Sequence, residues 1–411
     1  MCIQYYQSVV SINSICGAIL GIFPSALIFL VTTLKFITTD MTRQLNGIQV
    51  LRGIAALIVV LGHNRSLYGH IDSGSFIDYL TMQATFGVEI FFIISGFIIT
   101  YSTRNTSGDS LSRFYSFLTK RIFRIYPVYF IVLSLYVSLF CYNFKEGHFT
   151  LFEFSLSNII KSFLLIPLDP NISPPFYGWG TLIVSWTLGY EMYFYLVFSF
   201  SLLISTKYRS YISIAILMIV YLCLSISFGN PIDFNANTFH VPFYGYHSYL
   251  GFVGNPIIFD FVLGMIIAEC YLRFHKEVFE NKTIGYLSIP VITLCFMMWL
   301  IGFNSGQGIT HTGFIACLIV FCAICIETST KIEFPKFMIL MGTCSYSLYL
   351  IHVPIKKIIE IYGKDIPFIP QEASVIMFLM SISLSISLSI PMYYLVENKF
   401  IDMGHRLSKK I

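Results

Sequence analysis

Long apolar stretches recur along the chain and alternate with short polar connections. A helix of about 20 apolar residues is long enough to cross the roughly 30 Å of hydrocarbon in a bilayer. We expect ten such spans, at roughly 48–66, 82–101, 124–142, 182–204, 211–228, 256–274, 286–303, 312–327, 338–361 and 373–397. The pattern predicts an all-α polytopic membrane protein built as a bundle of about ten helices.

Residues 1–40 form a further apolar segment ahead of these spans, without a charged side chain up to Leu34. The segment could form one extra span. Alternatively, the protein could begin at Met41, because the residues that follow make a short basic lead into the first span, and we favour this second interpretation. The expected organisation is an N-terminal apolar segment, 1–40, followed by a transmembrane domain, 41–411.

The composition supports a membrane protein and excludes several other classes. Apolar residues make up 56% of the chain and charged residues 11%, whereas a soluble domain carries about 25% charged residues. So little charge cannot cover the surface of a water-soluble protein, and disordered and coiled-coil chains are excluded on the same grounds. The net charge of +4 is ordinary. We expect a lipid bilayer and no nucleic acid among the partners.

The distribution of Lys and Arg predicts the orientation of the spans. When residue 43 is placed in the cytoplasm and the ten spans are threaded, most of the 25 Lys and Arg residues fall on the inner side. Both ends of the ten-span core are then cytoplasmic. The cysteines fall mostly inside apolar runs, and the pair Cys322 and Cys325 lies within a span without a second ligand pair. We therefore expect no metal site.

The first core span carries two ionisable side chains, Arg52 and His63. Eleven residues make almost three helical turns, so both lie on one face, about 16 Å apart along the axis. A charged group at a span centre costs about 2.5–3.5 kcal/mol, so each one suggests a function. Glu89, in the next span, lies slightly deeper than His63, where its carboxylate could orient the imidazole. A snorkelling Arg and a structural Glu–His pair are the alternatives.

Arg121 and Arg124 lie at the cytoplasmic entry of the third span, three residues apart and on one helix face. Two guanidinium groups there suit an anionic phosphate, which arginine binds with paired hydrogen bonds. The alternative is that they only anchor the span end.

Two further ionisable residues lie within spans. Glu191 lies at about mid-depth in 182–204, and helical rise places His352 close in depth to His63 and Glu89. Each could also be a packed structural residue. Arginines near the inner side and carboxylates and histidines further out suit a phosphate-bearing donor bound from the cytoplasm and proton chemistry nearer the far side. We expect one continuous cavity to join them.

Five segments in order carry a resemblance: "IQVLRGIAALIVVLGH", "FGVEIFFIISGF", "RIFRIYP", "SWTLGYEMYFY" and "SYSLYLIH". From about Leu45 to Glu397 the chain resembles the acyltransferase-3 family of integral membrane O-acyltransferases, above all its bacterial members that modify exopolysaccharide and lipopolysaccharide. The resemblance implies that residues 41–411 form an acyltransferase domain in the bacterial inner membrane. It implies transfer of an acyl group, commonly acetyl, from acetyl-CoA as a donor substrate rather than a bound cofactor. The implied acceptor is a carbohydrate hydroxyl on exopolysaccharide, O-antigen or a lipid-linked glycan.

The resemblance assigns the arginines to the donor and His63 to catalysis. We expect Arg52, Arg121 and Arg124 to hold the phosphates of the acyl-CoA, His63 to act as general base with Glu89 orienting it, and His352 and Glu191 to complete the catalytic group. His63 could instead carry the acyl group as a nucleophile. A proton-coupled transporter of a small anionic or sugar substrate is the competing class, because transporters also use intramembrane carboxylates and histidines. A non-catalytic scaffold is the third.

Overall fold

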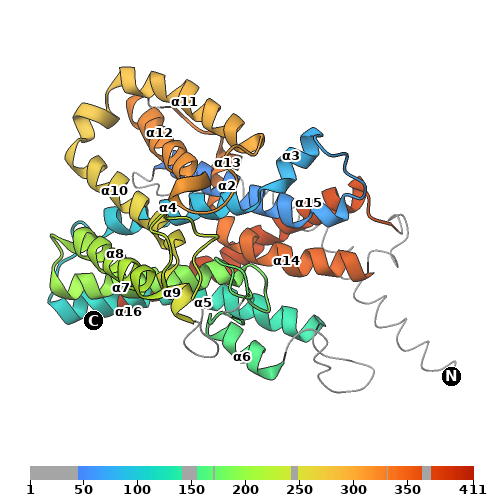
Figure 1. The fold of residues 1–411 in the computed structure, drawn as a ribbon, viewed down its shortest axis with the longest axis horizontal. Coiled ribbons are helices and arrows are strands. Elements are labelled where there is room, and N and C mark those ends of the chain that lie inside the picture. Colours follow the sequence, from blue (N-terminus) through green and yellow to red (C-terminus); the bar gives the residue numbers. More distant parts are fainter. Residues whose placement is uncertain (1–44, 141–154, 170–171, 242–248, 331, 363–371) are drawn as a thin grey trace.

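The computed structural model describes residues 45–140, 155–169, 172–241, 249–330, 332–362 and 372–411 (Figure 1). Within these residues nine helices are long and apolar enough to cross a membrane, or ten if one bent pair counts as a single span. The predicted all-α polytopic fold class is therefore confirmed. The N-terminal segment, 1–40, lies outside the described residues.

A long helix of the structure overlaps with each predicted span. These helices are α2 (Asn46–His63), α4 (Thr85–Ser102), α5 (Ser110–Phe140), α7 (Ser185–Ile204), α8 (Arg209–Phe228), α10 (Phe259–Arg273), α11 (Lys282–Leu300), α12 (Phe314–Thr330), α14 (Ser345–Tyr362) and α15 (Val375–Met392). The shorter elements are η1 (Arg65–Leu67), α3 (Phe76–Met82), α6 (Leu156–Phe163), α9 (Tyr249–Gly254), η3 (Pro256–Ile258), η4 (His275–Phe279), η5 (Ile309–Gly313), α13 (Lys336–Thr343), η7 (Tyr393–Glu397) and α16 (Asn398–Ser408).

Two spans differ from the prediction. Helix α5 begins at Ser110, well before the expected position 124. The first turns of α5 carry polar residues, and a search for apolar runs therefore starts the span too late. The span predicted at 338–361 is broken into α13 and α14, which meet at 69°. Gly342 next to the break packs directly on α2, where a Cβ atom would lie only 1.8 Å from the Gln49 carbonyl oxygen. The bend therefore coincides with a close helix contact that only glycine permits.

Helix α4 lies at the centre of the bundle, between α10, α11 and α12 on one side and α5, α7 and α8 on the other (Figure 1). It packs closely on α10 and α2. A Cβ atom at Gly96 would lie 2.0 Å from the Phe261 carbonyl oxygen, and one at Gly264 would lie 1.9 Å from that of Ile93. Glycines thus bring the α4 and α10 backbones together, as small residues do between membrane helices.

Because α4 and α10 meet through their glycines, we expect a larger side chain at this contact to destabilise the protein. Gly264→Val should lower the free energy of unfolding by about 1–3 kcal/mol, because α4 and α10 would have to separate to admit the new atoms. Ile266→Val is the matched control, because Ile266 on the same helix is 46% exposed. The thermal melting midpoint in detergent measures the difference. Equal midpoints for the two variants would contradict the close packing.

Candidate active site

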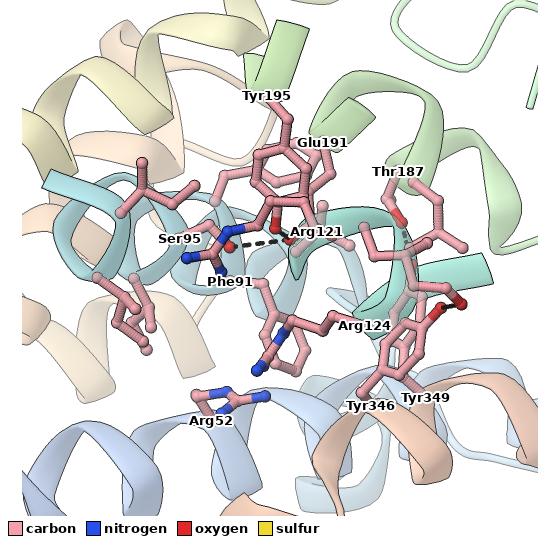
Figure 2. A pocket seen from close by; sticks show the side chains of 17 residues that line it. Arg52, Phe91, Ser95, Arg121, Arg124, Thr187, Glu191, Tyr195, Tyr346 and Tyr349 are labelled. Atoms are coloured by element: carbon pink, nitrogen blue, oxygen red, sulfur yellow. Dashed lines mark hydrogen bonds between the residues drawn. The ribbon is translucent and has the colours of Figure 1, made fainter. Parts of the chain in front are cut away.

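A cavity inside the bundle brings together the three arginines that the sequence singled out. Arg52 comes from α2, and Arg121 and Arg124 come from α5. Figure 2 shows their guanidinium groups turned toward one space between α2, α5 and α7. The cavity, its opening to solvent included, has an empty volume of about 730 Å³.

The positive charges in this pocket, which we call the arginine pocket, are only partly balanced. Glu191 is the one carboxylate among its lining residues, and the buried Glu397 also acts on Arg52 and Arg124, so two carboxylates face three arginines. The Arg121 Nε atom is buried and has no hydrogen-bond partner among the described residues. Its guanidinium lies over the Tyr195 ring, 5.6 Å from the ring centroid. Arg52 Nη1 donates to Gln49 Oε1 at 3.1 Å. A pocket with surplus positive charge suits an anionic ligand.

Glu191 belongs to the arginine pocket. Its carboxylate accepts a hydrogen bond from Ser95 Oγ at 3.3 Å and another from the Tyr195 hydroxyl (Figure 2). Tyr195 follows Glu191 by one helical turn on α7, so both side chains project from one face. Their electrostatic interactions extend to Arg121 and Arg124. The structure therefore separates Glu191 from the two histidines with which the sequence grouped it.

His63 and His352 are in direct contact. His63 Nδ1 and His352 Nε2 are 2.9 Å apart, and the two ring planes differ by 8°. His352 is fully buried, whereas His63 is half-buried. His63 is the last residue of α2, so it sits where that helix ends and some exposure remains. The structure thus unites two residues that lie 289 positions apart.

A buried asparagine fixes the end of α2 that carries His63. Asn64 is fully buried, and its Nδ2 atom donates to the Val60 carbonyl oxygen at 2.7 Å. Its Oδ1 atom accepts from Ser381 Oγ of α15 at 2.5 Å. Because both ends of the amide are held, the backbone beside His63 has a defined position.

The predicted continuous cavity between the arginines and His63 is not open in this structure. His63 is not among the residues that line the arginine pocket, which include Phe91 and Tyr349. The Tyr349 ring meets the Phe91 ring edge-on, with centroids 5.8 Å apart, and also meets the His352 ring, with centroids 6.2 Å apart. The Tyr349 hydroxyl is held to α7 by Thr187 Oγ1 at 2.8 Å. Tyr349 therefore stands between the pocket and the histidine pair.

The predicted pairing of Glu89 with His63 is wrong. Glu89 Oε1 accepts a hydrogen bond from the Gly308 backbone N–H at 2.8 Å, and its charged neighbour is Asp260 of α10. Both carboxylates are fully buried. In the sequence, the short connection between the first two spans predicts similar depths in the membrane for Glu89 and His63. Depth alone could not show that the backbone just before α12 folds in against Glu89.

On the other side of His63, outside the spans, α3 is held by an ion pair. The Gly74 backbone N–H and the Arg65 guanidinium both donate to the Asp78 carboxylate, and these hydrogen bonds hold the pKa of Asp78 below its usual range. Arg65 also donates to Thr81 Oγ1 at 2.6 Å. The charged pair therefore ties α3 to η1, directly after the end of α2.

Among the described residues, no group of three or more His, Cys, Asp or Glu side chains is placed so that it could hold a metal ion. Cys322 and Cys325 are free and buried. Polar residues of the arginine pocket that the sequence did not link to the arginines include Ser95, Tyr195 and Tyr346. For Tyr195, the available signal in the sequence was its spacing of four residues from Glu191, which places both on one helix face.

Comparison with known proteins agrees with this architecture. The family model of the acyltransferase domain Acyl_transf_3 matches residues 45–394. The Rhizobium meliloti "Exopolysaccharide production protein ExoZ" is 27% identical over 273 residues, which cover 65% of this chain and 74% of that protein. A Staphylococcus aureus (strain COL) protein named "Putative O-acetyltransferase" is 25% identical over 389 residues, 88% of this chain but only 58% of that protein. The Rhizobium leguminosarum "Nodulation protein 10" is 27% identical over 276 residues, 64% of this chain and 68% of that protein. The chain belongs to the acyltransferase-3 family.

Proposed function

We propose that this protein is a membrane O-acyltransferase that moves an acyl group, acetyl, from acyl-CoA to a hydroxyl group of a cell-surface or exported polysaccharide. The arginine pocket is the observation that carries the proposal. Three guanidinium groups turned into one pocket that has one lining carboxylate suit an anionic partner, and arginine binds phosphate with paired hydrogen bonds. The names of the relatives from R. meliloti and S. aureus support the polysaccharide and the acetyl group.

The rest of the pocket wall suits the non-phosphate part of such a donor. Apolar side chains from α4, among them Val88, Phe92 and Ile98, line the pocket beyond the arginines. A pantetheine arm is flexible and mostly uncharged, so it would lie against this wall with the diphosphate at Arg121 and Arg124. Its thioester would then point toward Tyr349, at the end of the pocket nearest the histidines.

In the proposed reaction His63 is the general base. His63 takes the proton from the acceptor hydroxyl, and the oxygen attacks the thioester carbonyl carbon. The new C–O bond forms as the C–S bond breaks, and the leaving thiolate of CoA takes this proton from His63. Glu89 has no part in these steps, because its carboxylate faces Gly308. Glu191 adjusts the charge of the donor pocket rather than the reactivity of His63.

The reaction requires a movement of aromatic side chains. The thioester can meet His63 only if the contact between Phe91 and Tyr349 opens. Opening would cost the hydrogen bonds of the Tyr349 hydroxyl with Thr187 of α7 and with the Val184 carbonyl oxygen just before it, each worth about 0.5–1.5 kcal/mol net. This cost is small enough for the bound donor to meet.

The proposed orientation places the arginine pocket toward the cytoplasm of a bacterial inner membrane, with both ends of the ten-span core on that side. Acyl-CoA is then available to the arginines directly. His63, at the opposite end of α2 from Arg52, faces the acceptor from the outer side. The acceptor is a carbohydrate such as exopolysaccharide, O-antigen or a lipid-linked glycan.

The proposal is tested with membranes that contain the protein, acetyl-CoA labelled in the acetyl group, and exported polysaccharide. We expect label in the polysaccharide and free CoA thiol in equal amounts, both dependent on added polysaccharide. Uptake of label without thiol release would instead indicate a transporter. Release of neither product, with no movement of label, would indicate a scaffold.

A further inference from the structure

His352 makes two hydrogen bonds that together determine the position of a proton on His63. His352 Nδ1 lies 3.2 Å from the Leu348 carbonyl oxygen, one turn back on α14. A carbonyl oxygen only accepts hydrogen bonds, so His352 Nδ1 carries a hydrogen. A neutral imidazole has one N–H, and His352 Nε2 is therefore a bare acceptor.

The second hydrogen bond, between the two histidines, determines which nitrogen of His63 carries the hydrogen. His63 Nδ1 lies 2.9 Å from His352 Nε2. Because His352 Nε2 is bare, His63 Nδ1 must supply the hydrogen. A neutral His63 then has no hydrogen on Nε2, and the lone pair of that atom is free. This is the tautomer that a general base needs.

The surroundings favour a neutral His352. The ring is fully buried, and the positive charge of Lys356 acts on both imidazoles. Protonation of His352 would add a second positive charge near that of Lys356, which is disfavoured. No carboxylate is hydrogen-bonded to either ring among the described residues. The hydrogen bond between the rings and their nearly parallel planes together define the direction of the His63 ring.

We infer that His352 is a positioning residue, which holds His63 in the tautomer with a free Nε2 lone pair and directs that atom toward the acceptor hydroxyl. In a Ser-His-Asp triad a carboxylate does this; here a buried neutral imidazole takes its place. The inference rests on the proposed function, because it concerns the base of the same transfer. When His63 accepts the acceptor proton on Nε2, the hydrogen bond to His352 helps to stabilise the resulting imidazolium.

Two amide variants that differ by one methylene group test the inference. In His352→Gln the side-chain oxygen reaches the position of His352 Nε2 and can accept from His63 Nδ1. In His352→Asn the amide ends near the position of Nδ1, so it can bind Leu348 but cannot reach His63. We expect the Asn variant to lose about 10²-fold in kcat, within the range that a positioned base contributes. The Gln variant should recover at least about 10-fold of that loss.

The KM for acyl-CoA should change in neither variant, because the arginine pocket does not include His352. His275→Asn is the control for the loss of a histidine outside the site. Wild-type kcat in His352→Asn, or equal losses in the Asn and Gln variants, would overturn the positioning role. His63→Ala, measured in parallel, separates this from the proposed function: if His63→Ala is inactive, the transfer chemistry stands even when the inference about His352 fails.

Discussion

His63→Ala is expected to abolish acyl transfer to polysaccharide while leaving the protein folded in the membrane. Removal of a positioned general base lowers kcat by about 10²–10⁴-fold. The KM for acyl-CoA should stay near its wild-type value, because His63 does not line the arginine pocket. Steady-state rates of thiol release, measured at varied acyl-CoA with saturating polysaccharide, give both constants.

The control for this variant is His275→Ala, since His275 lies in η4, away from both the arginine pocket and the histidine pair. Its rates should match the wild type. The melting midpoint in detergent shows whether His63→Ala remains folded. A folded His63→Ala protein with a full transfer rate would remove His63 from the chemistry.

Arg121→Ala and Arg124→Ala should weaken the binding of acyl-CoA. A hydrogen bond to a charged group contributes about 1.5–3 kcal/mol, so each change should raise the KM for acyl-CoA by about 10- to 100-fold. Arg121→Lys should not restore it fully, because lysine lacks the planar fork that binds phosphate and stacks on Tyr195. Because both arginines would contact one ligand, the double variant should lose less than the product of the single losses.

Arg113→Ala is the matched control for these variants. Arg113 also comes from α5, but its guanidinium bonds the Leu202 and Gly108 carbonyl oxygens and does not line the pocket. Its KM for acyl-CoA should be unchanged. An equal rise in KM for Arg113→Ala would mean that general positive charge on α5, and not the pocket, determines donor affinity.

Hydrophobic pattern alone predicted the helical spans well, because crossing a bilayer imposes a minimum length of apolar helix. It did not predict where a span breaks. The bend at 69° between α13 and α14 coincides with the contact of Gly342 with Gln49, from a distant part of the chain. The early start of α5 was missed because its first turns are polar. Both features depend on packing, which a local pattern does not record.

The same distinction holds for the site. Residues that share one helix face, such as Arg121 and Arg124, could be grouped from their spacing, and the structure places both in one pocket. Contacts between residues of different helices were harder to predict. The depth of a residue in the membrane does not say toward which neighbouring helix its side chain projects. Helical rise placed His352 close in depth to His63, and the structure brings the two rings into contact. The same reasoning paired Glu89 with His63, whereas Glu89 turns toward Gly308.

The central claim is that the arginine pocket and His63 act on one donor, on either side of Tyr349. A structure of the protein with a non-hydrolysable acetyl-CoA analogue tests it most directly. We expect the diphosphate between Arg121 and Arg124, the Phe91 and Tyr349 rings moved apart, and the acetyl carbonyl within reach of His63 Nε2. An analogue bound elsewhere, or one whose acetyl end stops on the arginine side of a closed Phe91–Tyr349 contact, would contradict the account.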